Sequence, residues 1–90
     1  MVQNDEMNEQ EIIFAMSQIR HVLARSPCRA DTTAGIHAYW ILWNEPRPLP
    51  PTTEEALQRL KLLGEVSHAQ LEDGTWVWSK HSTVTAKATK

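Results

Sequence analysis

The sequence predicts an α+β fold in which three helices are followed by a β-hairpin. Three observations support this prediction. Apolar residues recur at helical spacing after Asn8. A second helical stripe, beginning at Ala56, stops at Gly64. The dipeptide Asp73-Gly74 then separates two short segments of alternating character, a pattern typical of a hairpin.

The first helix is predicted over residues 8–25. Asn8 and Glu11 have the spacing of a reciprocal cap, in which each side chain bonds to the other end of the first turn. Ser26-Pro27 ends the helix because the residue before a proline is pushed out of the helical conformation. The apolar face is expected to hold Ile12, Ala15, Met16, Ile19, Val22 and Leu23. Ile13 and Phe14 lie beside it and make the face wide enough for a homodimer contact.

The second helix is predicted over residues 32–44, after a linker at 27–30 that has no periodicity. Asp31, Thr32 and Thr33 are candidate N-caps, and Ile36, Trp40 and Trp43 share one helical face. A strand through residues 36–42 is the alternative, because aromatic and β-branched residues also favour sheets.

The third helix is predicted over residues 53–63. The preceding segment 44–51, NEPRPLPP, holds four prolines and predicts a rigid loop. Thr52 as N-cap and Glu55 three residues later form a capping box. Gly64 is placed for a left-handed C-cap. The buried stripe is expected to contain Ala56, Leu57, Leu60 and Leu63.

The hairpin is predicted to turn through Glu72–Thr75. Asp73-Gly74 suits a type I′ turn, in which both central residues take positive φ. Trp76 and Trp78 share one face of the return strand, which is expected to cover the helices. The folded domain is predicted over residues 8–80, with a flexible acidic lead-in at 1–7 and a disordered basic tail at 81–90.

This order of elements resembles the winged-helix superfamily. The resemblance is carried by Leu57, Leu60, Gly64, Val66, Asp73-Gly74 and Trp76. It implies that the second and third helices form a helix-turn-helix. The third helix would enter the major groove of DNA, and the hairpin, or wing, would touch the backbone or the minor groove.

Binding to double-stranded DNA, as a transcriptional regulator or accessory factor, is therefore the first functional hypothesis. Gln58 and Arg59 have the geometry to read adenine and guanine, Lys61 would contact phosphate, and Lys80 and the tail would support these contacts. The simpler alternative is that these residues are the solvated face of an amphipathic helix. Acidic residues would repel phosphate at both expected contacts with DNA. At the start of the third helix these are Glu54 and Glu55, and at the tip of the hairpin they are Glu72 and Asp73. Arg20, Arg25, Arg29 and the lysines of the tail are the expected compensating surface.

The second hypothesis is a winged-helix adaptor or inhibitor that binds another protein without touching DNA. Trp43 and Trp78 are its candidate anchors, because tryptophan is enriched at interface hot spots. The location of positive charge discriminates the two hypotheses. A continuous basic face joining Arg59, Lys61 and Lys80 favours DNA, whereas dispersed charges beside an exposed tryptophan favour a protein partner.

The composition argues against several other classes. The 90 residues carry a formal charge of −2, with pI about 6.0 and one cysteine. Scattered histidines and a lone cysteine predict no metal site, no catalytic pair and no cofactor, so no enzyme is expected. His37 and His68 are expected to be half-exposed. With no signal peptide and no apolar run of spanning length, the expected location is cytoplasmic and away from membranes.

Overall fold

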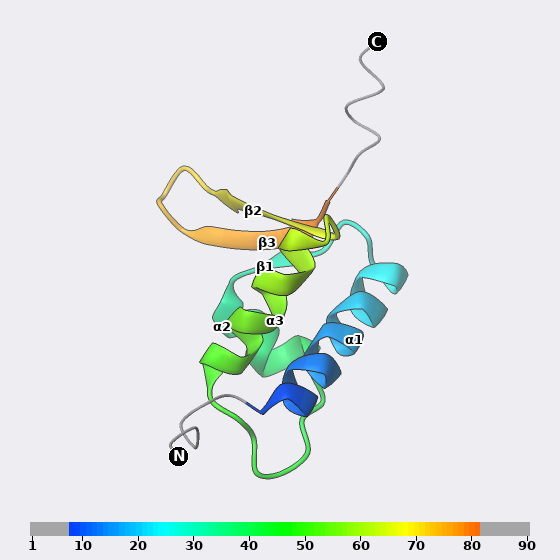
Figure 1. The fold of residues 1–90 in the computed structure, drawn as a ribbon. Helices are drawn as coiled ribbons and strands as arrows, with labels where there is room; N and C mark the ends of the chain where they lie inside the picture. Colours follow the sequence, from blue (N-terminus) through cyan, green and yellow to red (C-terminus); the bar gives the residue numbers. More distant parts are fainter. Residues whose placement is uncertain (1–7, 82–90) are drawn as a thin grey trace.

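A computed structural model describes residues 8–81, which form three helices followed by a β-hairpin that joins a short strand in an antiparallel sheet (Figure 1). The predicted α+β class is confirmed. The helical elements are α1 (Glu9–Arg25), α2 (Thr33–Gly35) with its π-helical continuation η2 (Ile36–Trp40), and α3 (Pro50–Leu62). The strands are β1 (Ala30–Asp31), β2 (Val66–Gln70) and β3 (Trp76–Lys80). The predictions for residues 1–7 and 82–90 lie outside the described residues.

Helix α1 has the predicted bounds, but the expected reciprocal cap is formed only by Asn8, since no hydrogen bond joins the Glu11 side chain to the Asn8 N–H. The Asn8 side-chain oxygen accepts the backbone N–H groups of Gln10 at 2.8 Å and Glu11 at 3.3 Å, and so caps the first turn. The helix buries Ile12, Ala15, Ile19 and Leu23. Ile13 remains 55% exposed, on the side expected for a dimer contact.

The second helix is shorter than the predicted range of 32–44. It ends at Trp40 because Ile41 takes extended backbone angles, φ −110° and ψ 126°. The Thr32 hydroxyl accepts the Gly35 N–H at 3.1 Å and caps the helix. Ile41 is nevertheless 3% exposed, so apolar residues continue into the core beyond the helix. The spacing of apolar residues is the same for this buried extended residue as for a further turn of helix, so the sequence pattern does not distinguish them.

The third helix begins earlier than predicted. Leu49, not Thr52, occupies the N-cap position, and Pro50 and Pro51 fill the first turn. Proline is tolerated there because its missing N–H would have no partner in the helix. Thr52 is instead buried at 4% exposure.

The end of α3 confirms the predicted role of Gly64, which takes φ +80°. Its N–H donates to the Lys61 carbonyl at 2.9 Å, and the Glu65 N–H donates to the Leu60 carbonyl at 2.9 Å. These two bonds are those of a Schellman C-cap. Because the helix stops at Leu62, the prediction of a buried Leu63 is wrong, and this residue is 60% exposed.

The sheet has the order β1-β3-β2. Of the two residues of β1, Ala30 was expected to be linker and Asp31 a candidate N-cap, because so short a segment shows no alternation; they pair with Ser79 and Trp78. The hairpin is confirmed, but its turn is not type I′. Residues 71–75 connect the strands, and only Gly74 among them takes positive φ, at +93°.

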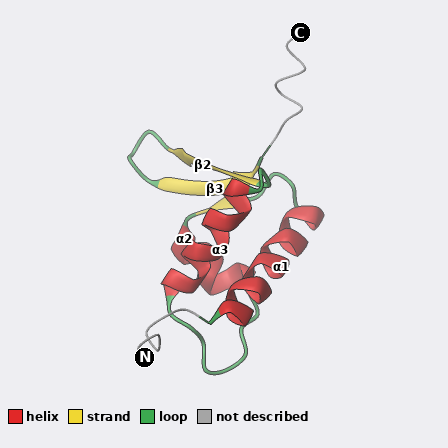
Figure 2. Cartoon of the chain, viewed as in Figure 1, coloured by secondary structure: helices red, strands yellow, loops and turns green. Residues whose placement is uncertain are grey.

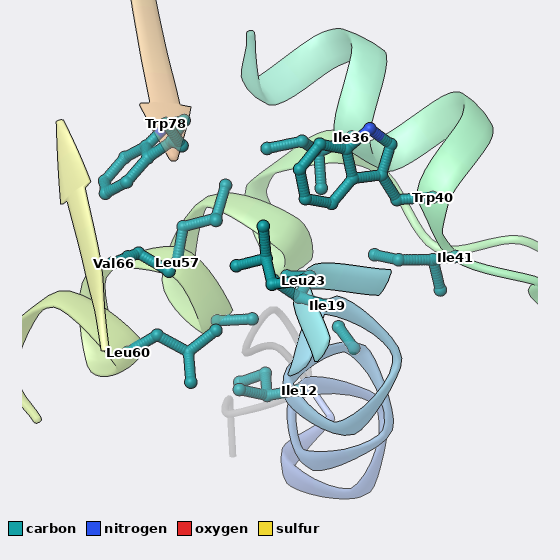
Figure 3. Close-up of a cluster of buried hydrophobic side chains, with 12 residues drawn as sticks. Ile12, Ile19, Leu23, Ile36, Trp40, Ile41, Leu57, Leu60, Val66 and Trp78 are labelled. Carbon is teal, nitrogen blue, oxygen red and sulfur yellow. The ribbon is translucent and has the colours of Figure 1, made fainter. Parts of the chain in front are cut away.

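The core lies between the helices and the inner face of the sheet, which crosses the C-terminal end of α3 (Figure 2). Figure 3 shows side chains from both layers converging. The buried hydrophobic residues are Ile12, Ala15, Ile19, Leu23, Ile36, Trp40, Ile41, Ala56, Leu57, Leu60, Val66 and Trp78. This arrangement is consistent with a winged-helix-like topology, with β2 and β3 in the position of the wing.

Candidate interaction surface

The outer face of α3 is mixed in character rather than basic. The helix turns Thr53, Leu57 and Leu60 into the core, which leaves Gln58, Lys61 and Leu62 outward. Leu62 is 86% exposed, the largest value among the exposed large hydrophobic side chains of the described residues. Where the DNA hypothesis expected donors for bases and phosphates, one of the most prominent side chains is therefore aliphatic.

Arg59 is held by two carboxylates. Its Nε donates to Glu55 at 2.9 Å, and its two terminal nitrogens donate to the two oxygens of Glu9 on α1. These hydrogen bonds raise the pKa of Arg59 above its ordinary value and lower the pKa of Glu9. The fork that would read guanine is thus engaged within the protein.

Gln58 is likewise engaged, in a chain of hydrogen bonds that runs to the wing. Its side-chain amide donates to Glu54 at 2.8 Å, and the other Glu54 oxygen accepts the Thr33 hydroxyl at 3.0 Å. The Thr33 hydroxyl in turn accepts the indole N–H of Trp78 at 2.8 Å. Glu54 therefore supports the packing of α2, α3 and β3 on one another.

The wing presents an aromatic surface on its inner face. His68 stacks on Trp78, with centroids 3.9 Å apart and planes 10° apart. Trp76 lies against the same imidazole at 4.7 Å. Trp78 is 1% exposed, so its prediction as a partner anchor is wrong; the helices beneath it leave no accessible face. Trp76, which was not predicted as an anchor, is 50% exposed.

The tip of the wing is acidic. Glu72 and Asp73 are both exposed. The Asp73 carboxylate accepts the backbone N–H of Thr75 at 2.9 Å, and this bond lowers the pKa of Asp73. The carboxylate is accordingly charged at neutral pH. The tip would repel a phosphate backbone and attract a cation.

Lys80 lies at the opposite end of the wing, beside a groove of about 440 Å³ between α1 and the sheet. An ion pair of Arg20 and Glu65, with Nε and Oε1 2.7 Å apart, also borders this groove. The groove meets α1 at residues 19–24, whereas Arg59 meets α1 at Glu9. Ten or more helical residues correspond to roughly 15 Å along the axis. The structure does not bring the Arg59 guanidinium and Lys80 together.

Trp43 belongs to an aromatic cluster beside the N-terminal half of α1. Its ring lies 5.8 Å from Phe14 and 5.3 Å from His37, and its indole N–H donates to the His37 carbonyl at 2.9 Å. The side chain is half-buried and borders a groove of about 270 Å³ that also contacts Pro46 and Pro48.

His37 was expected to be half-exposed, but it is 6% exposed beneath the proline-rich loop. The Thr53 hydroxyl lies 2.7 Å from its Nδ1. Burial is the main cause of a lowered His37 pKa. The sequence carried no signal for this pair, because sixteen residues separate its members.

Comparisons with family models, curated proteins and solved structures found no match to this chain. No helix of the described residues is long and apolar enough to cross a membrane. Within residues 8–81, no group of three or more His, Cys, Asp or Glu side chains is placed to hold a metal ion.

Proposed function

We propose that this protein is a winged-helix module that binds another protein, with the wing and the outer face of α3 as its contact surface. The observation that carries the proposal is the half-exposed Trp76, which lies on a wing with an acidic tip. Large aromatic side chains supply much of the binding energy at protein interfaces. The exposed Leu62 extends the apolar character to α3.

The distribution of charge also supports a protein partner. Of the residues expected to contact DNA, Gln58 and Arg59 bond to neighbouring carboxylates. Reading a base would require those bonds to break, which leaves a carboxylate near the DNA. Arg59 and Lys80 do not form one continuous basic face.

Duplex DNA is the second candidate. Lys61 and Lys80 are exposed and form no ion pair with another described residue. Arg25 and Arg29 are exposed near the end of α1, and the Arg29 guanidinium lies 5.3 Å from the Trp40 ring. A DNA complex that used this end of the molecule would leave the wing tip free.

The deciding experiment titrates labelled random-sequence duplex DNA with the full chain and follows fluorescence anisotropy at low and moderate salt. We expect no binding even at low salt. Binding that weakens steeply with salt and is lost in Lys61→Ala or Lys80→Ala would show phosphate contacts, and the proposal would then fail.

A second experiment tests the protein surface directly. The wild-type chain and its Trp76→Ala variant are compared as baits in chemical cross-linking to partners in a cell extract, with Tyr39→Ala, which truncates an exposed aromatic residue outside the wing, as the matched control. The proposal expects the same cross-linked partner with the wild type and the control, and its loss with Trp76→Ala. Equal cross-linking of the partner by the wild type and Trp76→Ala would exclude the wing from the contact surface.

A further inference from the structure

We propose that the free edge of β2 accepts an extended segment of the partner protein as a fourth strand of the sheet, and that this segment carries Lys or Arg next to the wing tip. The inference rests on the proposed function and specifies the partner's chemistry. It depends on the register of the hairpin, on the exposure of one strand edge and on the charge around it.

The register follows from hydrogen bonds at the two ends of the hairpin. At one end the Leu71 N–H donates to the Thr75 carbonyl at 2.7 Å, and at the other the His81 N–H donates to the Glu65 carbonyl at 3.0 Å. Opposed residues in an antiparallel ladder alternate between pairs that exchange hydrogen bonds and pairs that do not. The pairs Leu71–Thr75 and Glu65–His81 therefore both belong to the class that exchanges hydrogen bonds.

The alternation assigns the remaining pairs. The bonded pairs inside the hairpin are Ser67 with Ser79 and Ala69 with Val77. Val66, His68 and Gln70 belong to the other class, so their N–H and C=O groups point away from β3. The close spacing of that class also accounts for the stacking of His68 on Trp78 directly opposite.

The edge of β2 is open. β2 is the outermost strand, and Figure 1 shows it along the margin of the sheet. No backbone hydrogen bond from the rest of residues 8–81 reaches Val66, His68 or Gln70 from outside the sheet. Natural proteins commonly blunt such an edge with lysine, proline or a bulge. The segment VSHAQ contains neither residue, and its register with β3 is continuous.

The surroundings of this edge favour a basic occupant. Residues 66–79 contain Glu72 and Asp73 but no Lys or Arg. Trp76 is half-exposed, and a tryptophan ring attracts a cation placed over its face. Addition of an extended segment would supply main-chain hydrogen bonds, and the acidic tip would select its charge. A second copy of β2 fits less well, because the strand itself contains no Lys or Arg and its wing carries the same acidic tip.

The test uses the isotope-labelled full chain and two synthetic peptides, acetyl-Lys-Val-Thr-Val-Lys-Val-amide and the same peptide with Glu in place of Lys. Amide hydrogen exchange is measured by NMR. The Lys peptide should slow exchange at Val66, His68 and Gln70 by about tenfold, as expected when exposed amides gain backbone partners. The N–H groups of Ser67 and Ala69, already bonded to β3, should change little, and the Glu peptide should have no effect.

A pair of variants isolates the strand edge. Gln70→Pro removes an N–H that points outward, and proline is tolerated at such edge positions. Gln70→Ala keeps that N–H. Both variants lose the side-chain bond from Gln70 to the Gly74 carbonyl at 3.2 Å, so they are matched in the hairpin. The Lys peptide should bind Gln70→Pro roughly tenfold more weakly than Gln70→Ala, the effect of one lost backbone hydrogen bond and its neighbours.

Three results would overturn the inference: equal binding of the two peptides, equal affinity of the two variants, or protein-concentration-dependent protection of the same amides without peptide. The last would assign the edge to a second copy of the chain. Partner cross-linking that needs Trp76 but persists in Gln70→Pro would retain the proposed function and reject the fourth strand. Salt-sensitive duplex binding that needs Lys61 or Lys80 would reject the proposed function itself.

Discussion

Trp78 and Trp76 are two residues apart on the same strand and the same face, yet their environments differ. Trp78 is 1% exposed and donates its indole N–H to Thr33, whereas Trp76 is 50% exposed and lies against His68. Strand alternation places both side chains on the inner face of the sheet. Only the base of the wing has helices beneath it, so alternation sets the direction of a side chain but not its burial.

The comparison separates two roles within one hairpin. The base, with Val66 and Trp78, closes the core. The tip projects past the helices (Figure 1) and presents an acidic turn and a half-exposed indole. Changes at the base should therefore reduce the free energy of unfolding, and changes at the tip should chiefly affect binding.

The largest expected effect is that of Trp78→Ala. The substitution leaves a cavity and removes the indole N–H bond to the Thr33 hydroxyl, and it should lower the free energy of unfolding by about 3–5 kcal/mol, measured by urea denaturation. Trp76→Ala is the matched control. Because half of its surface is already exposed, its loss should be about 1 kcal/mol. Equal losses at the two positions would contradict the division between base and tip.

Gly64→Ala tests the turn that joins α3 to the wing. A Cβ at Gly64 would meet no heavy atom within 4 Å, so the cost comes only from the backbone at φ +80°. An L-residue in that conformation costs about 1 kcal/mol, and the melting temperature should fall by about 4–8 °C. Gly64→Asn should lose less, because asparagine tolerates this region better. An alanine variant as stable as the wild type would exclude the left-handed cap.

The pH dependence of stability tests the helical body. Because burial lowers the His37 pKa below its ordinary value of 6.5, the unfolded chain binds this proton more readily than the folded one. The associated stability is present above about pH 6.5 and is lost as the pH falls below that value towards the folded-state pKa.

Urea denaturation at pH values between about 7 and 5 should show this decline, and His37→Gln should flatten it. Glu9, Glu65 and Asp73 have lowered pKa values. The stability that these carboxylates contribute to the folded state is therefore present above pH 4.5 and is lost only as the pH falls further. An unchanged slope in His37→Gln would assign the decline to other groups.

The smallest expected effect on stability is that of Leu62→Ala. Leu62 is 86% exposed, and its truncation should change the free energy of unfolding by less than about 0.5 kcal/mol. Leu60→Ala, on the buried side of α3, should cost about 2–5 kcal/mol. Weaker cross-linking of the partner by Leu62→Ala at unchanged stability would place α3 in the contact surface; unchanged cross-linking would restrict that surface to the wing.

Local patterns predicted that three helices and a hairpin exist, their order along the chain, and the glycine that ends α3. The Asn8 cap and the Gly64 turn depend on neighbouring backbone groups, which is why spacing alone predicted them. The end of the second helix and the start of the third were missed. Ile41 continues the apolar pattern in an extended conformation, and prolines can belong to a first helical turn as readily as to a loop.

The candidate site was less predictable because it depends on contacts between distant segments. The pairing of Arg59 with Glu9 joins residues fifty positions apart, and the strand Ala30–Asp31 exists only because β3 lies beside it. Periodicity identifies which face a residue belongs to, since that follows from backbone geometry within one element. How the elements pack determines whether Trp76 is exposed, whether Arg59 pairs with carboxylates and whether the edge of β2 is open. Packing in turn depends on contacts between segments that lie far apart in the sequence.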